Sequence, residues 1–180
     1  MEKRYIIGID QSTQGTKALL FDGVGHLLRR TDLPHRQIVN EKGWVSHDLN
    51  EIYRNTVQTV KTLVAESGVA PETIAGIGIS NQRETTAIWD KATGEPLEEA
   101  IVWQCGRASG IAQEIAEQGH AEEIREATGL QLSAYFPAAK MAWLLRNGGE
   151  ERQKRAADGK LCLGTIDSCL LYTSPSPRDM

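Results

Sequence analysis

The residues best suited to chemistry begin with Asp10, which follows a short apolar run at 6–9 and precedes a polar turn at 11–16. The turn carries amides, hydroxyls and one glycine, and a second apolar run follows at 18–21. Such a turn offers hydrogen-bond donors without bulk, and the Asp10 carboxylate could hold a cation beside a phosphate. The pattern indicates either a phosphate-handling hairpin or an ordinary surface hairpin with a polar tip. It is not a P-loop, because the Gly-Lys-Ser/Thr order of that motif is absent.

An adjacent arginine and glutamate, Arg83 and Glu84, lie in a polar break between apolar stretches at 74–80 and 86–89. Loops at strand ends commonly carry functional groups. A guanidinium presents a fork of donors and a carboxylate presents only acceptors, so together they could hold adjacent hydroxyls of a polyol. The alternative is a structural pair that binds neighbouring loops.

Two aromatic residues, Trp103 and Tyr135, stand at predicted loop edges. An indole and a phenol offer flat apolar faces to the carbon side of a polyol, and the phenol hydroxyl can bond one of its oxygens. The other tryptophans, Trp44, Trp89 and Trp143, have patterns that suit burial. Only the first pair therefore supports a ligand hypothesis.

The remaining residue types point to no further chemistry. The four histidines are scattered without the spacing of metal ligands, so none is assigned to a metal or to general-base duty. No Gly-x-Ser-x-Gly elbow is present, so acyl chemistry has no support.

The elements that must position these residues can be predicted from spacing. The first three strands form a meander through residue 33, and apolar residues at helical spacing then predict a helix over 49–67. Asp48 and Glu51 have capping-box spacing, and Gly68 ends the run. Further strands at 74–80, 86–89, 100–103 and 161–163 are expected, with helices at 107–118, 121–127 and 137–146. Strands, a helix and more strands indicate an α/β fold.

The strand at 74–80 contains Gly76 and Gly78. Glycine inside a strand often marks a close approach by another backbone. We therefore expect a second element to pack tightly against this strand.

Bulk composition limits the function further. With 180 residues, the chain has room for one ordinary domain. Its net charge is −4, from 20 basic and 24 acidic residues without a long run of either sign, so nucleic acid and membrane are not expected partners. Three cysteines without a Cys-x-x-Cys pair argue against a disulfide framework or a zinc site. The start of the chain lacks a signal-peptide core, and we expect a cytoplasmic protein.

Several sequence blocks stand in a fixed order along the chain. They are Ile9-Asp10-Gln11 with the polar turn, Gly43-Trp44-Val45 with His47-Asp48, and residues 80–86, 100–105, 128–130, 135–136 and 164–168. Through these blocks the chain resembles the N-terminal part of the FGGY family of carbohydrate kinases, and within it the members that phosphorylate glycerol, over about residues 5–168.

The resemblance implies an actin-like, ribonuclease H-like fold, with a mixed sheet flanked by helices and incomplete in this chain. It implies ATP and Mg²⁺ as cofactors, a polyol substrate and a homo-oligomeric full-length parent. By position, the implied polyol-binding residues are Arg83, Glu84, Trp103 and Tyr135. The implied magnesium-side residue is Asp10, and the implied phosphate-facing residues are Thr13, Gln14, Gly15 and Lys17.

The implied reaction is transfer of the ATP γ-phosphoryl group to a terminal hydroxyl, glycerol being the expected acceptor. Two departures from the family pattern weaken the substrate assignment. Many glycerol-phosphorylating members have Gly at the place of Ser12 and Arg at the place of Lys17. A kinase for another polyol or ketose, such as erythritol or xylulose, and a non-catalytic polyol-binding module are the alternatives.

The end of the chain departs most from the family pattern. After Ser168 the family continues with Trp-Leu and a second half that carries the catalytic base, whereas residues 169–180 resemble a read-through of a sequencing adapter. We therefore expect a kinase domain over 1–168, a non-native tail over 169–180, no catalytic base in this chain and no turnover by it.

Overall fold

The computed structural model describes residues 4–173 and divides the chain into two compact units. The first unit consists of Met1–Gln37 and His47–Gln82, and the second of Ile38–Ser46 and Arg83–Met180. Each unit has its own sheet and its own apolar core. The predicted α/β class, with a mixed sheet flanked by helices, is confirmed.

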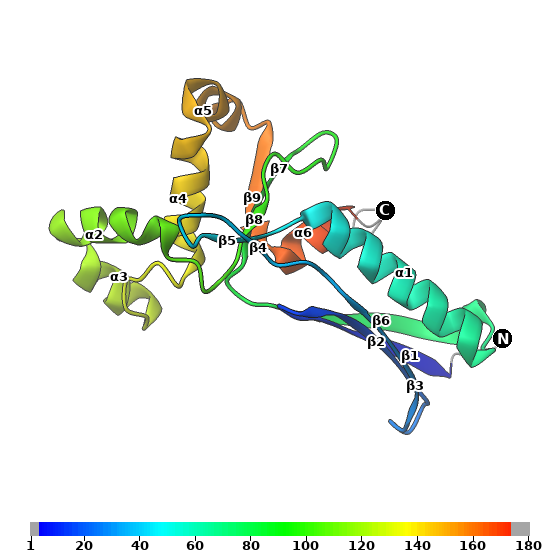
Figure 1. Cartoon of the computed structure of the whole chain (residues 1–180). Coiled ribbons are helices and arrows are strands. Elements are labelled where there is room, and N and C mark those ends of the chain that lie inside the picture. Colours follow the sequence, from blue (N-terminus) through cyan, green and yellow to red (C-terminus); the bar gives the residue numbers. More distant parts are fainter. Residues whose placement is uncertain (1–3, 174–180) are drawn as a thin grey trace. The chain divides into compact units, whose positions relative to one another are not determined.

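The first unit is a four-stranded sheet with one long helix (Figure 1). Its strand order is β3-β2-β1-β6, with β1 antiparallel to β2 and parallel to β6. The elements are β1 (Tyr5–Gln11), β2 (Gly15–Phe21), β3 (Leu27–Pro34), α1 (Leu49–Ser67) and β6 (Ile74–Asn81), with a 3-10 turn at Pro71–Thr73 before β6.

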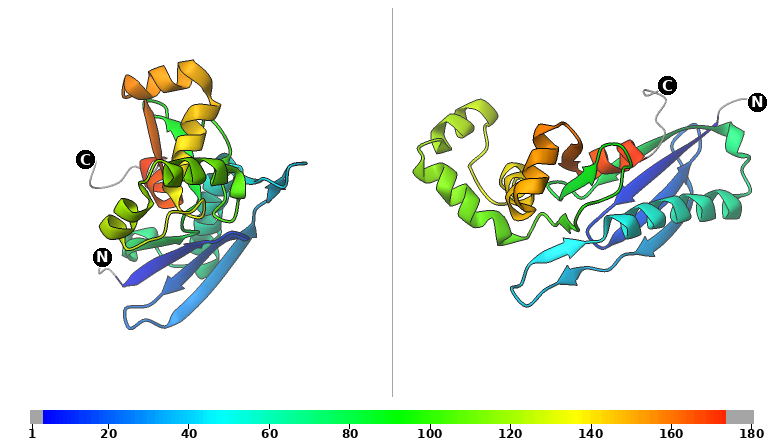
Figure 2. Two further views of the ribbon diagram at one scale, coloured as in Figure 1. Left: turned by 90° about the vertical axis from the view of Figure 1, so that its left-hand side faces the viewer. Right: turned by 90° about the horizontal axis from the view of Figure 1, so that it is seen from above.

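Helix α1 lies along one face of this sheet (Figure 2). Alternation along β1 places Ile7 and Ile9 on that face, where they pack with Leu20 and with Leu63 of the helix. The helix begins after Asp48, whose side chain accepts hydrogen bonds from the amides of the first turn, and it ends at Gly68 in the left-handed conformation (φ 70°). The helix predicted over 49–67 is therefore confirmed.

The second unit is built on a five-stranded sheet of order β4-β5-β8-β7-β9. Its strands are β4 (Ile38–Val39), β5 (Val45–His47, whose last residue belongs to the first unit), β7 (Thr86–Asp90), β8 (Ala100–Ile101) and β9 (Leu161–Thr165). Its helices are α2 (Ser109–Glu117), α3 (Ala121–Thr128), α4 (Pro137–Asn147), α5 (Gly149–Ala157) and α6 (Ile166–Thr173).

Two apolar clusters hold the second unit together. Ile88 and Ile101 of the sheet pack with Leu144 of α4, and Ile111 of α2 packs with Ala139 of α4. Helix α4 thus belongs to both clusters and joins the sheet to the α2 region.

Several details differ from the sequence-based expectations. Strands β1 and β2 extend beyond their apolar runs, so the turn between them is only Ser12–Gln14. The expected strand at 100–103 is two residues long. Helix α5 was not predicted, because its sequence GEERQKRAA carries no apolar periodicity. Cys105, Cys162 and Cys169 are free cysteines in this structure.

The expected close packing at Gly76 and Gly78 is wrong for the described residues. A Cβ atom added at either glycine would have no neighbour within 4 Å. The reason is that β6 lies at the edge of the described sheet, while α1 packs chiefly on β2 and β3. Ile77 on the same strand is 56% exposed.

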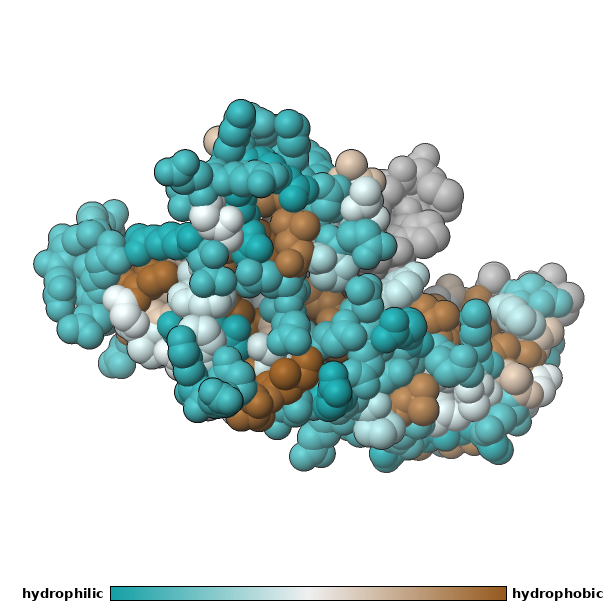
Figure 3. Space-filling model, turned by 45° about the horizontal axis from the view of Figure 1, so that its top comes forward, coloured by the Kyte–Doolittle hydropathy of each residue, from teal (hydrophilic) through white to brown (hydrophobic). Residues whose placement is uncertain are grey.

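Apolar side chains reach the surface in several separate areas of the face shown in Figure 3. Among residues 4–173, no helix combines the length and the hydropathy that a membrane crossing requires.

Candidate functional site

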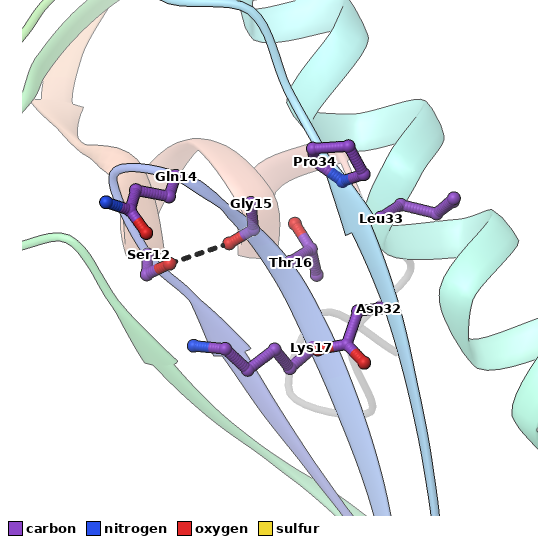
Figure 4. Close-up of a pocket in the computed structure, with 8 residues that line it drawn as sticks. All are labelled: Ser12, Gln14, Gly15, Thr16, Lys17, Asp32, Leu33 and Pro34. Carbon is purple, nitrogen blue, oxygen red and sulfur yellow. Dashed lines mark hydrogen bonds between the residues drawn. The ribbon is translucent and has the colours of Figure 1, made fainter.

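The β1–β2 turn is closed by its own hydrogen bonds. The Ser12 amide and the Ser12 hydroxyl both donate to the Gly15 carbonyl oxygen, at 2.9 Å and 3.0 Å (Figure 4). The turn borders a depression of about 190 Å³, lined by Ser12, Gln14, Gly15, Thr16, Lys17, Asp32, Leu33 and Pro34. Gln14 at the tip is exposed and Thr13 is half-buried.

Gly15 is required by the close approach of the neighbouring strand. A Cβ atom at this position would lie 2.6 Å from the Leu33 carbonyl oxygen and 2.9 Å from the Pro34 Cα atom. Both are backbone atoms of β3, which cannot move aside like a flexible side chain. The glycine therefore allows β3 to reach the turn.

Asp10 and Lys17 face each other across the β1–β2 pair. They are register partners, and the Lys17 Nζ atom donates to the Asp10 Oδ2 atom at 2.8 Å. Both side chains are partly exposed, at 42% for Asp10 and 34% for Lys17. A ligand can therefore reach this ion pair.

The Asp10 carboxylate fits one mode of magnesium binding. No group of three or more His, Cys, Asp or Glu side chains in residues 4–173 could hold a metal ion. Mg²⁺ in phosphate-handling sites is commonly held by one or two carboxylates, with water and substrate phosphates completing the shell. Asp10 could supply such a carboxylate, because it is partly exposed and its hydrogen bond with Lys17 is made through one of its two oxygens, Oδ2.

A buried polar network supports the turn from behind, and sequence reasoning missed it. The Gln82 side chain donates to the Gln11 side-chain oxygen at 3.2 Å and lies 3.1 Å from the His47 Nδ1 atom. His47 meets His35 edge to face at 4.5 Å between ring centroids, and the His35 amide donates to the Gln14 carbonyl oxygen. Burial lowers the pKa of His47 to about 4. Gln11 could have been found, because it continues the buried alternation of Ile7 and Ile9.

In the second unit, Glu84 has a backbone conformation unusual for its type. Its φ is 65°, the only positive φ at a non-glycine residue in the described part of the chain. Its carbonyl oxygen accepts from the Thr86 hydroxyl at 3.1 Å. Such conformations cost free energy and are enriched at ligand sites. Arg83 beside it has an exposed side chain.

The structure brings Trp103 and Tyr135 together, although 32 positions separate them in the sequence. Their ring centroids are 5.8 Å apart at an interplanar angle of 67°. The buried Thr85 hydroxyl accepts from the Trp103 backbone amide at 3.2 Å, which ties the main chain at Trp103 to the segment that carries Arg83 and Glu84. Tyr135 is 41% exposed, so its ring is open to a ligand.

The other tryptophans only partly follow their predicted burial. Trp89 is buried, at 2% exposure, whereas Trp44 and Trp143 are half-buried. Those two rings contact each other edge to face and enclose the Arg107 guanidinium, at 5.1 Å and 5.3 Å from its Cζ atom.

One further residue near the aromatic pair had no sequence signal. Lys140 of α4 is fully buried, and its Nζ atom donates to the carbonyl oxygens of Ala134 and Tyr135. Burial lowers its pKa to about 8. A lysine at an otherwise apolar helix position is usually interpreted as a surface residue, which explains the omission.

The expected ligand groups divide between the units. Asp10, Thr13, Gln14, Gly15 and Lys17 belong to the first unit. The second unit contains Arg83, Glu84, Trp103 and Tyr135.

Comparison with known proteins identifies relatives along nearly the whole chain. The model of the FGGY family of carbohydrate kinases, N-terminal domain, matches residues 5–173. Glycerol kinase of Enterococcus casseliflavus is 46% identical over 95% of this chain and 34% of its own length. Glycerol kinase 2 of Thermotoga maritima is 43% identical over 97% of this chain and 35% of its own length. The chain thus spans about a third of these relatives.

Solved structures are similar in fold. Glycerol kinase of Plasmodium falciparum, determined with ADP, superposes with a TM-score of 0.81 at 33% identity, over 95% of this chain and 34% of that one. A ligand-bound xylulose kinase of Lactobacillus acidophilus superposes with a TM-score of 0.77 at 23% identity, over 93% of this chain and 32% of that one. The second likeness concerns the fold alone.

Proposed function

Because the chain belongs to the FGGY family of carbohydrate kinases, we propose that it is the N-terminal part of an ATP-dependent kinase for a small polyol. The proposed acceptor is glycerol, which would become glycerol 3-phosphate. The relatives that are 42–46% identical support glycerol, since each is a glycerol kinase.

The observation that carries the proposal is the contact between half-buried Trp103 and exposed Tyr135, next to the hydrogen bond between the Trp103 amide and the Thr85 hydroxyl. Two ring faces can take the carbon side of a polyol while Arg83 donates to its hydroxyls and Glu84 accepts from them. The backbone of Glu84 has a positive φ, a strained conformation that is typical of residues preorganised for ligand binding.

The β1–β2 turn would serve the phosphate side. We propose that Thr13, Gln14, Gly15 and Lys17 face the phosphates, and that Asp10 holds Mg²⁺ through its carboxylate. Bound Mg²⁺ would neutralise charge on the transferring phosphoryl group. The Lys17 ammonium would exchange its contact with Asp10 for a phosphate oxygen, which keeps both charges paired.

The 180-residue chain is expected to bind but not to phosphorylate. None of the site residues proposed here is assigned as the general base that the reaction requires. The chain also spans only about a third of the length of its relatives. Phosphorylation of glycerol by the purified chain, measured as ADP release, would contradict this part of the proposal.

Polyol binding can be tested on the 180-residue chain by saturation-transfer NMR with glycerol, erythritol and xylulose. Glu84→Gln and Arg83→Met are each expected to weaken glycerol binding about tenfold, because each removes a charged hydrogen-bond partner. The control is Glu126→Gln, an exposed change in the same unit. Equal binding by the wild type and both site variants would reject the assigned site, and preference for xylulose would favour the ketose alternative. The full-length parent, assayed with the same acceptors, tests the transfer itself.

A further inference from the structure

A buried ammonium group, that of Lys140, lies close to the Tyr135 ring of the aromatic pair. Lys140 is fully buried, and the residues flanking it on the buried side of α4, Ala139 and Leu144, are apolar. Removing an ammonium group from water is unfavourable unless hydrogen bonds and opposite charge replace its hydration. An apolar side chain would fill the same place without that cost, so a charged group at this position indicates a specific role for its hydrogen bonds.

The partners of Lys140 show what it holds. Its Nζ atom donates to the Ala134 carbonyl oxygen at 2.6 Å and to the Tyr135 carbonyl oxygen. Both acceptors lie in the segment between α3 and α4, which forms neither helix nor strand. Carbonyl groups there have no ladder or helical turn to satisfy them. Lys140 supplies these donors, and it therefore fixes the main chain at Tyr135.

The ring of Tyr135 also lies close to the ammonium group. The Nζ atom is 6.0 Å from the ring centroid, at the outer limit of a cation–π contact. The ring also meets Phe136 edge to face at 5.1 Å, besides its contact with Trp103. The Glu84 carboxylate acts on Lys140 electrostatically and favours its charged form. One buried cation thus connects two of the proposed polyol groups.

We propose that Lys140 is a positioning residue for polyol binding: it holds the main chain of Ala134 and Tyr135 so that the Tyr135 ring stays against Trp103. This inference rests on the proposed function for its ligand, although the ordering of Tyr135 can be measured without one. Lys140 itself touches no substrate in this scheme. Its effect reaches the polyol only through the phenol ring.

The experiment compares Lys140→Met with Lys140→Arg in the 180-residue chain labelled with 3-fluorotyrosine. The chain has four tyrosines, so Tyr135→Phe assigns the Tyr135 fluorine resonance. In Lys140→Met this resonance is expected to shift and broaden while the others stay unchanged, and glycerol affinity is expected to fall about tenfold. Lys140→Arg, which keeps the charge and donors, should restore part of both. Lys154→Met is the matched control, because Lys154 is exposed on α5.

An unchanged Tyr135 resonance in folded Lys140→Met would overturn the inference. If Lys140→Met does not fold, the wild type provides the test. A buried, hydrogen-bonded Lys140 ammonium group should give its own slowly exchanging ¹⁵N signal, and Lys140→Arg should lack that signal. Absence of that signal at pH 7 would also overturn it. If the wild type binds no glycerol, the proposed function fails, and the fluorine spectrum still determines whether Lys140 orders Tyr135.

Discussion

The Arg107 side chain connects several segments of the second unit. Its guanidinium lies between the Trp44 and Trp143 rings and donates to the Val45 carbonyl oxygen at 3.0 Å and to the Ser46 hydroxyl at 2.7 Å. It also donates to the Cys105 sulfur at 3.1 Å, which helps to lower the pKa of that thiol against the opposing effect of burial. A planar fork can do all of this at once, whereas an ammonium group cannot.

Arg107→Lys is therefore expected to destabilise the second unit by about 1–3 kcal/mol, the cost of lost charged hydrogen bonds and stacking. All four tryptophans lie in this unit, so urea unfolding followed by tryptophan fluorescence reports on it alone. Arg125→Lys, at an exposed ion pair with Glu122, should change stability by less than about 1 kcal/mol. Equal effects of the two substitutions would contradict the role given to Arg107.

Gly15 allows a matched comparison within one sheet. Gly15→Ala is expected to cost about 1–3 kcal/mol in the first unit, because the new methyl group would meet the β3 backbone. Gly78→Ala, where nothing lies within 4 Å, should be neutral or slightly stabilising. Amide hydrogen exchange of β1 and β2 measures both. Protection unchanged by Gly15→Ala would show that β3 can yield.

At the scale of elements, helix α1 is the main support of the first sheet. It packs on β2 and β3 and contributes Leu63 to the core, and its start is set by Asp48. Asp48 accepts from the Asn50 amide at 2.8 Å and the Glu51 amide at 3.2 Å. The return half of the predicted capping box is not formed, because the Glu51 carboxylate instead accepts from the Arg36 amide at 3.2 Å. Glu51 thus ties the helix to the chain after β3.

Asp48→Ala should cost about 1 kcal/mol of stability, since two amides at the helix start lose their acceptor. Asp48→Ser, which restores a capping oxygen, should recover most of it. Far-UV circular dichroism during urea unfolding measures the loss. If serine and alanine were equally destabilising, the cap would not account for the effect.

At the scale of the whole molecule, each of the two units has its own apolar core and its own share of the proposed ligand groups. The buried histidine pair, His35 and His47, belongs to the first unit, and burial lowers the pKa of both imidazoles. Glu51 opposes this shift at His35, and the neighbouring imidazole adds to it at His47. Stability should therefore depend on pH differently in the two units.

The first unit is expected to lose stability as pH falls from about 6.5 to about 4. The unfolded chain takes up protons from the ordinary histidine pKa of 6.5, whereas folded His47 resists protonation until about pH 4. Lowering the pH within that window therefore favours unfolding. Above about pH 6.5, neutral His47 causes no loss of stability. Hydrogen exchange of α1 amides at pH 7, 5.5 and 4.5 measures the loss. His47→Asn should flatten this dependence, whereas His120→Asn, at an exposed histidine of the second unit, should not. An unchanged profile in His47→Asn would rule out His47 as the cause.

Local signals alone determined the parts of this protein that depend on near neighbours in the chain. The spacing of apolar residues, the cap at Asp48 and the stop at Gly68 predicted α1 correctly, because a helix is specified within a few turns. The family blocks identified the fold and named the ligand residues, whose binding roles stay predictions.

Tertiary structure decided what is buried, because burial depends on contacts between segments distant in sequence. Burial of the polar residues His47 and Lys140 was not predicted from the sequence, yet both are fully buried with hydrogen-bond partners supplied by the fold. Gly78 shows the reverse, since it predicts close packing but lies at an open strand. The contact between Trp103 and Tyr135 likewise exists only once the chain from β8 to α4 has folded.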